Sequence, residues 1–163
     1  MGKRVPKKIV IVGAGFAGIY AFFELHKRYH KDPSVSLRLI SATDYFLFTP
    51  LLHEVATGGV SQENVAFTIY SMAPCCLDFT KARVEKIDTA GKIVITSAGE
   101  FEYDYLVYAL GSSTNFLGLP EAAQKRVLPL KTLADARAIK SQLVGLFKQG
   151  EMPRVVVVGG GPT

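Results

Sequence analysis

The sequence has few of the residues that build disulfide frameworks, metal centres or membrane spans. Its only cysteines, Cys75 and Cys76, are adjacent, so they form neither a framework nor a Cys-x-x-Cys redox pair, and we expect both to serve in packing. His53 has no metal-ligand spacing to His26 or His30, so no metal site is predicted. No apolar run reaches the roughly 18 residues of a membrane-spanning helix, and the first residues lack a signal-peptide layout. These absences make a reducing compartment the default expectation.

Charge of one sign is present in only mild excess. The formal net charge is +5, and the lysines and arginines are scattered rather than gathered in a stripe. Such a charge suits a phosphate-bearing ligand or an anionic lipid surface, and nucleic-acid binding is not predicted. A chain of 163 residues holds one core of ordinary domain size, and 48% hydrophobic with 20% charged residues is typical of a soluble α/β domain.

The N-terminal region carries a pattern typical of a dinucleotide site. Apolar β-branched residues at positions 9–12 lead into Gly13, Gly15 and Gly18, spaced as Gly-x-Gly-x-x-Gly, and an apolar helix follows. Gly13 allows the turn, Gly15 removes the Cβ that would bar a pyrophosphate, and Gly18 lets the helix lie close to the strand. The amides and the positive dipole end of that helix favour the anion. A glycine turn with a purely structural role is the alternative.

A helix over residues 15–29 and a strand over residues 35–40 complete a right-handed βαβ unit. After such a second strand, nucleotide-binding folds usually offer Asp or Glu to the ribose. Here the position is Ser41, and Asp44 follows three residues later. Ser41 either bonds a ribose hydroxyl without charge assistance, or the site makes no 2′-hydroxyl contact.

The remaining sequence predicts short elements and a restart of the opening pattern. Thr49 as N-cap, Pro50 and Gly58 outline one helix, and a second is expected over residues 64–76. Residues 83–88, 92–97 and 100–103 predict an antiparallel meander before a last parallel strand at 105–109. A capping box at Thr132 opens a helix that ends near residue 149. Residues 154–158 then form an apolar strand that leads into further glycines.

Together these patterns resemble the two-dinucleotide-binding-domain flavoproteins of the pyridine nucleotide-disulfide oxidoreductase superfamily. The residues that carry the resemblance are 13–18, 105–111 and 155–161, which span the chain. Residues 44–52, 55–58 and 156–163 are most similar to the type II NADH:quinone oxidoreductases, or NADH dehydrogenases. The Cys-x-x-x-x-Cys pair of the disulfide reductases is absent after the second strand, which argues against thiol chemistry.

The resemblance implies an α/β fold in three parts. The first is a Rossmann-like FAD-binding domain over residues 1–115, a parallel sheet with an inserted β-meander. A linker and helix follow over 116–150, and a truncated NAD(P)H-binding domain begins over 151–163. The residues implied to bind FAD are Gly13, Gly15, Phe16, Ala17, Gly18, Ser41, Thr49, Pro50, Leu51, Val84, Ala109, Leu110 and Gly111, and those implied to bind NADH are Gly159 and Gly161.

Within that set, the resemblance places the adenine near the backbone of Val84 and the flavin toward residues 49–51. Ser41 and Leu110 stand where the family usually has an acidic residue and a threonine. No acid, base or nucleophile is assigned, because the flavin performs the chemistry and the protein orients it.

The resemblance also implies electron transfer from NADH through the flavin to a quinone, in an enzyme attached peripherally to the cytoplasmic face of the cell membrane through a later segment. It makes this sequence the N-terminal part of a longer protein and inactive by itself. The alternatives are a sulfide:quinone reductase-like flavoprotein and a non-catalytic nucleotide-binding or redox-sensing module. From the residues themselves, we expect the exposed edge at 154–158 to pair with a neighbouring copy in a homodimer.

Overall fold

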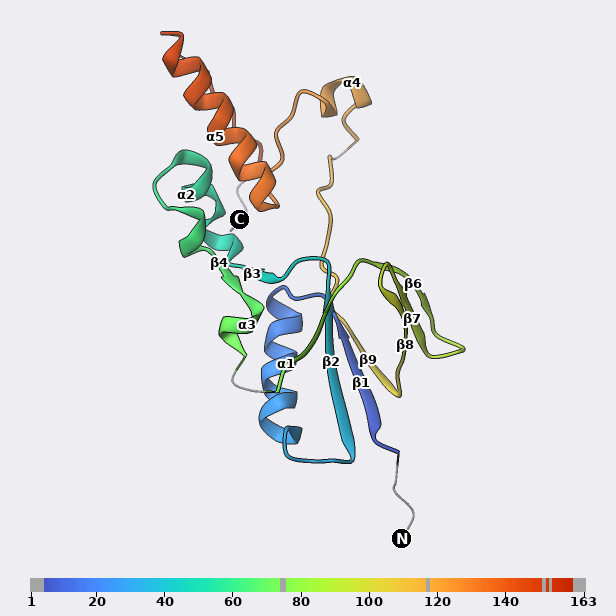
Figure 1. Ribbon diagram of the computed structural model, residues 1–163. Coiled ribbons are helices and arrows are strands. Elements are labelled where there is room, and N and C mark those ends of the chain that lie inside the picture. The colour runs from blue at the N-terminus through green and yellow to red at the C-terminus, as the bar shows by residue number, and fades with distance from the viewer. Residues whose placement is uncertain (1–4, 74–75, 117, 151, 153, 160–163) are drawn as a thin grey trace. The chain divides into compact units, whose positions relative to one another are not determined.

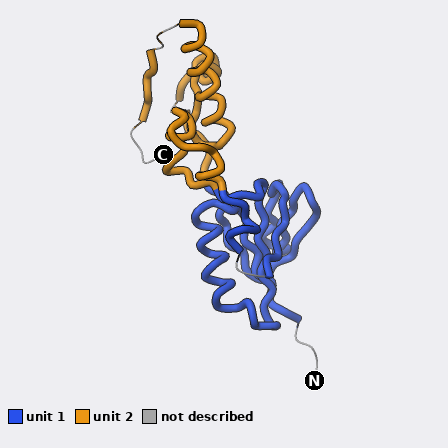
Figure 2. Tube along the Cα trace, turned by 60° about the vertical axis from the view of Figure 1, so that its left-hand side comes forward, with its two compact units in different colours: residues 1–46, 67–111 blue, residues 47–66, 112–163 orange. Residues whose placement is uncertain are grey.

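The computed structural model describes residues 5–73, 76–116, 118–150, 152 and 154–159. The chain divides into two compact units, one of residues 1–46 and 67–111 and the other of residues 47–66 and 112–163 (Figure 2). The short strands β3 (Tyr45–Leu47) and β4 (Ala66–Thr68) pair with each other, and the unit boundaries fall inside them. Each unit has a hydrophobic core of its own.

The first unit is built around a four-stranded sheet in the order β5-β2-β1-β9 (Figure 1). The central strand β1 (Lys7–Val12) pairs with β2 (Val35–Ser41) and with β9 (Tyr105–Tyr108), and β5 (Asp78–Lys81) pairs with the outer edge of β2. All three pairings are parallel. The apolar β-branched run of β1 suits this place because a central parallel strand is covered on both faces. The predicted βαβ unit and last parallel strand are confirmed.

The helix α1 (Phe16–Tyr29) lies against one face of this sheet, and an antiparallel meander lies against the other (Figure 1). Val10 and Val12 of β1 pack with the meander residue Val94, whereas Ile11 points to the opposite face because side chains alternate along a strand. The predicted meander is confirmed as β6 (Val84–Asp88), β7 (Ile93–Thr96) and β8 (Gly99–Glu102).

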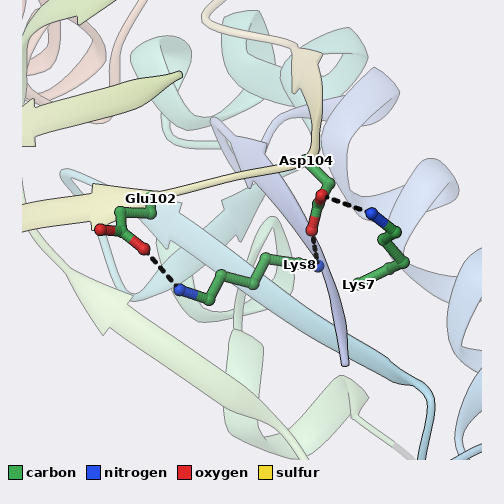
Figure 3. Close-up of polar contacts among 4 residues, drawn as sticks. All are labelled: Lys7, Lys8, Glu102 and Asp104. Carbon is green, nitrogen blue, oxygen red and sulfur yellow. Dashed lines mark hydrogen bonds and ion pairs between the residues drawn. The ribbon is translucent and has the colours of Figure 1, made fainter. Parts of the chain in front are cut away.

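The start of β1 is tied to the connection between β8 and β9 (Figure 3). The Asp104 carboxylate accepts hydrogen bonds from the backbone N–H of Lys8 at 2.8 Å and from Lys7 Nζ at 2.9 Å. Lys8 Nζ donates to Glu102 at 2.6 Å. These ion pairs are solvent-exposed and each adds little stability, so their main effect is to fix where the strand begins.

The second unit is helical in its described part. Its elements are η1 (Thr49–Leu51), α2 (Leu52–Thr57), η2 (Gln62–Asn64), α4 (Glu121–Gln124) and α5 (Leu133–Lys148). The core between α2 and α5 consists of Leu52, Val55, Ala56, Val65, Leu133 and Ala136. The predicted capping box of α5 is confirmed, because Thr132 Oγ1 accepts from Asp135 N at 3.2 Å and the Asp135 carboxylate accepts from Thr132 N at 2.7 Å. α2 ends, as predicted, at Gly58 with a φ of +86°.

Several local predictions are wrong. Residues 64–76 do not form one helix: the end of η2, β4 and the short α3 (Ile69–Met72) occupy this stretch, because the Thr68 hydroxyl accepts from Ser71 N and starts a new turn there. Thr49 is the first residue of η1 rather than its cap, and Phe48 precedes it without a side-chain cap bond. Cys76 is exposed rather than packed, and Cys75 lies outside the described residues. The strand β5 was not predicted.

Among the helices that the structure describes, none combines the length and the apolar character that crossing a bilayer requires.

Candidate nucleotide-binding site

The carboxyl ends of β1, β2 and β9 meet at the predicted glycine turn. Gly13 N donates to the Ile40 carbonyl of β2 at 2.8 Å, and Ala109 N donates to the Val12 carbonyl of β1 at 2.9 Å. Gly13 has a φ of +99°, in the left-handed region, and a Cβ at this position would collide with the carbonyl oxygen of Ala109. The turn is therefore closed by backbone contacts that glycine alone permits.

The other two glycines of the motif differ in their surroundings. A Cβ at Gly18 would collide with the Gly13 carbonyl oxygen and would lie 3.4 Å from the Ala109 Cβ, so the helix and the turn touch there. A Cβ at Gly15 would meet nothing within 4 Å. Gly18 thus allows the helix to pack directly against the turn, whereas Gly15 leaves space in front of the helix start.

The start of α1 has the features of an anion-binding helix terminus. Gly15, Phe16 and Ala17 are exposed, no side chain caps the helix, and its first turn has no acidic residue. The positive end of the helix dipole is thus not offset by a carboxylate of its own first turn. An anion at this position gains both the dipole and the backbone N–H groups.

Three further groups of predicted residues belong to the first unit. Ser41 is buried at the end of β2, where its Oγ accepts from Thr43 N at 3.4 Å. Val84 begins β6 and packs partly buried against the core. Leu110 and Gly111 follow β9 and are exposed, with a Gly111 φ of +75°. The structure thus brings Ser41 and residues 109–111 to the edge of the sheet that carries the glycine turn.

The other predicted residues belong to the second unit or lie outside the description. Thr49, Pro50 and Leu51 form η1, with Pro50 and Leu51 exposed. Gly159 has a φ of +112° and follows an exposed run of valines. Gly161 lies outside the described residues.

A groove of about 530 Å³ lies at the opposite, amino-terminal end of the parallel sheet. Arg38 lines it, and its guanidinium lies 4.8 Å from the centre of the Phe101 ring and 2.9 Å from the Asp78 carboxylate. Ligands of open parallel sheets bind at the carboxyl ends of the strands, so this groove is separate from the candidate nucleotide site. Its lining includes Lys8, Val10, Arg38, Ile93, Phe101 and Glu102.

Comparison with known proteins decides the family. The family model described as "Pyridine nucleotide-disulphide oxidoreductase" matches residues 7–163. The chain belongs to this family. The members of this family are FAD-dependent enzymes. The predicted family, the predicted Rossmann-like α/β fold and FAD as the predicted cofactor of the family are therefore confirmed.

The relatives within the pyridine nucleotide-disulphide oxidoreductase family include quinone reductases. The chain is 32% identical to the external alternative NAD(P)H-ubiquinone oxidoreductase B3 of Arabidopsis thaliana mitochondria, over 99% of this chain and 31% of the relative. It is 29% identical to a type II NADH:quinone oxidoreductase of Staphylococcus saprophyticus, over 94% of this chain and 40% of the relative. The chain therefore spans between about a third and two fifths of the length of these curated relatives.

A solved structure of the same fold comes from a protein with a different named substrate. The sulfide:quinone oxidoreductase of Aquifex aeolicus is 28% identical, with a TM-score of 0.76 over 87% of this chain and 32% of that one. Fold similarity alone therefore does not distinguish NADH from sulfide as the electron donor.

Sequence reasoning missed two parts of this edge of the sheet. The first is Lys81, because β5 was not predicted and residues 78–81 contain a single apolar residue, Phe79, to mark the strand. The second is the contact of Ala109 with Gly13, for which the small side chain after the last strand was the one available signal.

Proposed function

We propose that this chain carries the FAD site of a type II NADH:quinone oxidoreductase. The single observation that supports this most is the glycine turn, where Gly13 and Gly18 confine the backbone while the start of α1 at Gly15 stays open and exposed. The two named quinone reductases among the relatives support the choice of reaction. Bound FAD supplies hydride acceptance from NADH and electron release to the quinone.

The chain's own residues hold and orient the cofactor in this proposal. Gly15, Phe16 and Ala17 face the diphosphate at the helix start, beside residues 109–111. Ser41 and Val84 serve the adenosine half, and residues 49–51 serve the flavin end. Gly159 and Gly161 serve the NADH.

The proposal extends to the cellular setting. Quinones are apolar and dissolve in the bilayer, so an enzyme that reduces them works at a membrane surface. In this proposal the protein attaches peripherally to the cytoplasmic face of the cell membrane. We include a homodimer in the proposal, because Val155 to Val158 are between 63% and 87% exposed and offer an apolar segment that a second copy can cover.

Titration with FAD tests the proposed site directly. Binding is followed by quenching of flavin fluorescence in the purified chain and in a Gly15→Ala variant. We expect the added methyl group to weaken FAD binding at least about tenfold, because it occupies space next to the diphosphate. The urea midpoint stays unchanged, since a Cβ at Gly15 meets nothing within 4 Å.

Gly145→Ala is the matched control. A Cβ at Gly145 also meets nothing within 4 Å, but this residue lies on α5 in the second unit. We expect it to leave FAD affinity unchanged. Equal FAD affinity in the Gly15→Ala variant and the unmodified chain would contradict the proposed site.

A sulfide:quinone reductase is the second candidate, favoured by the 28% identical solved structure. Reduction of bound FAD in the whole protein separates the two candidates, with NADH and sulfide added anaerobically in parallel. We expect bleaching of the flavin band by NADH alone, with no loss after Cys76, which is exposed, is alkylated. Bleaching by sulfide that alkylation abolishes would favour the second candidate, and bleaching by neither donor would favour a non-catalytic module.

A further inference from the structure

The end of β2 lacks the carboxylate that usually receives the ribose of a dinucleotide, and Ser41 stands in its place. Ser41 is buried and already accepts hydrogen bonds from two backbone N–H groups nearby. Its Oγ accepts from Thr43 N at 3.4 Å, and its carbonyl oxygen accepts from Ala82 N at 2.8 Å. A serine in this position is a weaker ribose partner than a carboxylate, because its hydrogen bonds have no charge assistance.

A carboxylate nevertheless lies at the same edge of the sheet. Asp44 follows Ser41 by three residues, and its Oδ2 lies 2.8 Å from Lys81 Nζ. Lys81 is the last residue of β5 and is the register partner of Ser41. The Asp44 carbonyl oxygen accepts from Ile69 N at 2.9 Å, which fixes the backbone behind the carboxylate.

The pair has the properties that a ribose contact requires. The Asp44 and Lys81 side chains are 48% and 57% exposed, so both are reachable from solvent. The hydrogen bond from Lys81 lowers the pKa of the Asp44 carboxyl below its ordinary value, and the group is ionised at neutral pH. A carboxylate has about four acceptor sites, so one lysine does not exhaust them.

We propose that Asp44 receives the ribose hydroxyls of the adenosine half of the dinucleotide, and that Lys81 is the positioning residue that holds it at the end of β2. This inference rests on the proposed FAD site and adds a specificity-determining residue to it. The pair restores the carboxylate that position 41 lacks, from the loop that follows the strand. Lys81 acts only through Asp44.

The experiment uses the purified chain with FAD and two competing nucleotides. ADP and 2′-deoxy-ADP displace FAD, and they differ only in the ribose 2′-hydroxyl. We expect ADP to bind the unmodified chain about tenfold more tightly than 2′-deoxy-ADP, the effect of one hydrogen bond to a charged group. In Asp44→Asn the preference for ADP falls to less than about twofold, and FAD binds about tenfold more weakly.

The variant of the positioning residue separates the two roles. Lys81→Met should reduce the preference for ADP by a smaller factor, and the double variant should show no more loss than Asp44→Asn alone. Glu102→Gln is the matched control, because it removes an exposed ion pair, Lys8 to Glu102 at 2.6 Å, at the other end of the sheet. We expect it to change neither FAD affinity nor the preference for ADP.

Each outcome decides between the hypotheses. An unchanged preference for ADP in Asp44→Asn overturns this inference. An equal loss of affinity for ADP and for 2′-deoxy-ADP, together with a lowered urea midpoint, also overturns it, because it indicates a structural role for Asp44. Either result leaves the FAD site in place as long as the unmodified chain binds FAD. If the unmodified chain binds no FAD, the proposed function fails and this inference fails with it.

Discussion

Two stretches of this chain have the same sequence pattern and different structures. Residues 9–12 and 155–158 are both apolar, rich in valine and followed by glycines. In the first stretch Val10, Ile11 and Val12 are at most 3% exposed, between β2 and β9. In the second, Val155 to Val158 are at least 63% exposed, and no strand is assigned between residues 154 and 159.

The glycines after the two stretches are more alike than the stretches themselves. Gly13 and Gly159 have φ values of +99° and +112°. A turn conformation is thus set locally by the residue, whereas a strand needs neighbours that take up its hydrogen bonds and cover its side chains. The two turns therefore differ in the strand that precedes them and not in the backbone conformation of the glycine itself.

The largest contrast is expected from the glycines. Gly13→Ala should destabilise the chain by about 3–5 kcal/mol, because the methyl group meets the Ala109 carbonyl and the positive φ is strained. Gly159→Ala should lower the unfolding free energy by less, about 1 kcal/mol, because its φ of +112° is also strained for alanine but its Cβ meets nothing within 4 Å. Urea unfolding measures the unfolding free energy of both variants. Equal losses of unfolding free energy would contradict the difference described between the two stretches.

A smaller contrast is expected from the valines. Val12→Ala should lower the unfolding free energy by about 2 kcal/mol, because Val12 is fully buried and the substitution leaves a cavity. Val157→Ala, at an 82% exposed residue, should cost less than about 0.5 kcal/mol. Thermal unfolding of the two variants provides the measurement. A loss at Val157 as large as that at Val12 would mean that the second stretch is packed in solution.

A charge in the exposed run tests whether a second copy covers it. Val156→Lys should shift the chain toward the monomer in sedimentation velocity runs, because a lysine opposes strand pairing at an open edge. The unfolding free energy should stay within about 0.5 kcal/mol of the unmodified chain, since Val156 is exposed. If the unmodified chain sediments as a monomer at every concentration, the proposed dimer is wrong.

The smallest effect concerns the ion pairs that hold the start of β1. Hydrogen bonds from Lys8 N and Lys7 Nζ lower the pKa of the Asp104 carboxyl below its ordinary value of 3.8. A lowered native pKa adds stability that is complete above that ordinary value and is lost as the pH falls through the native pKa. Asp104→Asn should therefore flatten the loss of stability at acid pH, measured by urea unfolding in a pH series. An unchanged slope would show that Asp104 does not contribute to it.

The sequence predicted those parts of the fold that depend on local chemistry or strong periodicity. The apolar run of β1, the glycine spacing, the capping box at Thr132 and the alternating meander all have the predicted structure. Each of these patterns has its physical cause within a few residues. The family was predictable for the same reason, since its glycine turn is a local pattern.

The parts that sequence missed depend on residues far apart in the chain. β5 is four residues long and exists because it pairs with β2, so its own sequence gives a weak signal. Residues 64–76 have apolar content suited to a helix, but β4 pairs with β3 and takes the stretch out of helical conformation. The Asp44–Lys81 pair follows from β5 and could not be predicted without it.

The contact between Gly13 and Ala109 has a consequence for biosynthesis. The opening strand, turn and helix leave the ribosome early, but the backbone that seals the turn belongs to a segment made much later. A nascent chain that ends before β9 contains the glycine motif but lacks the backbone contacts that close the turn. We therefore expect the nucleotide to bind only after β9 has been synthesised, and not to guide the folding of the opening strand, turn and helix.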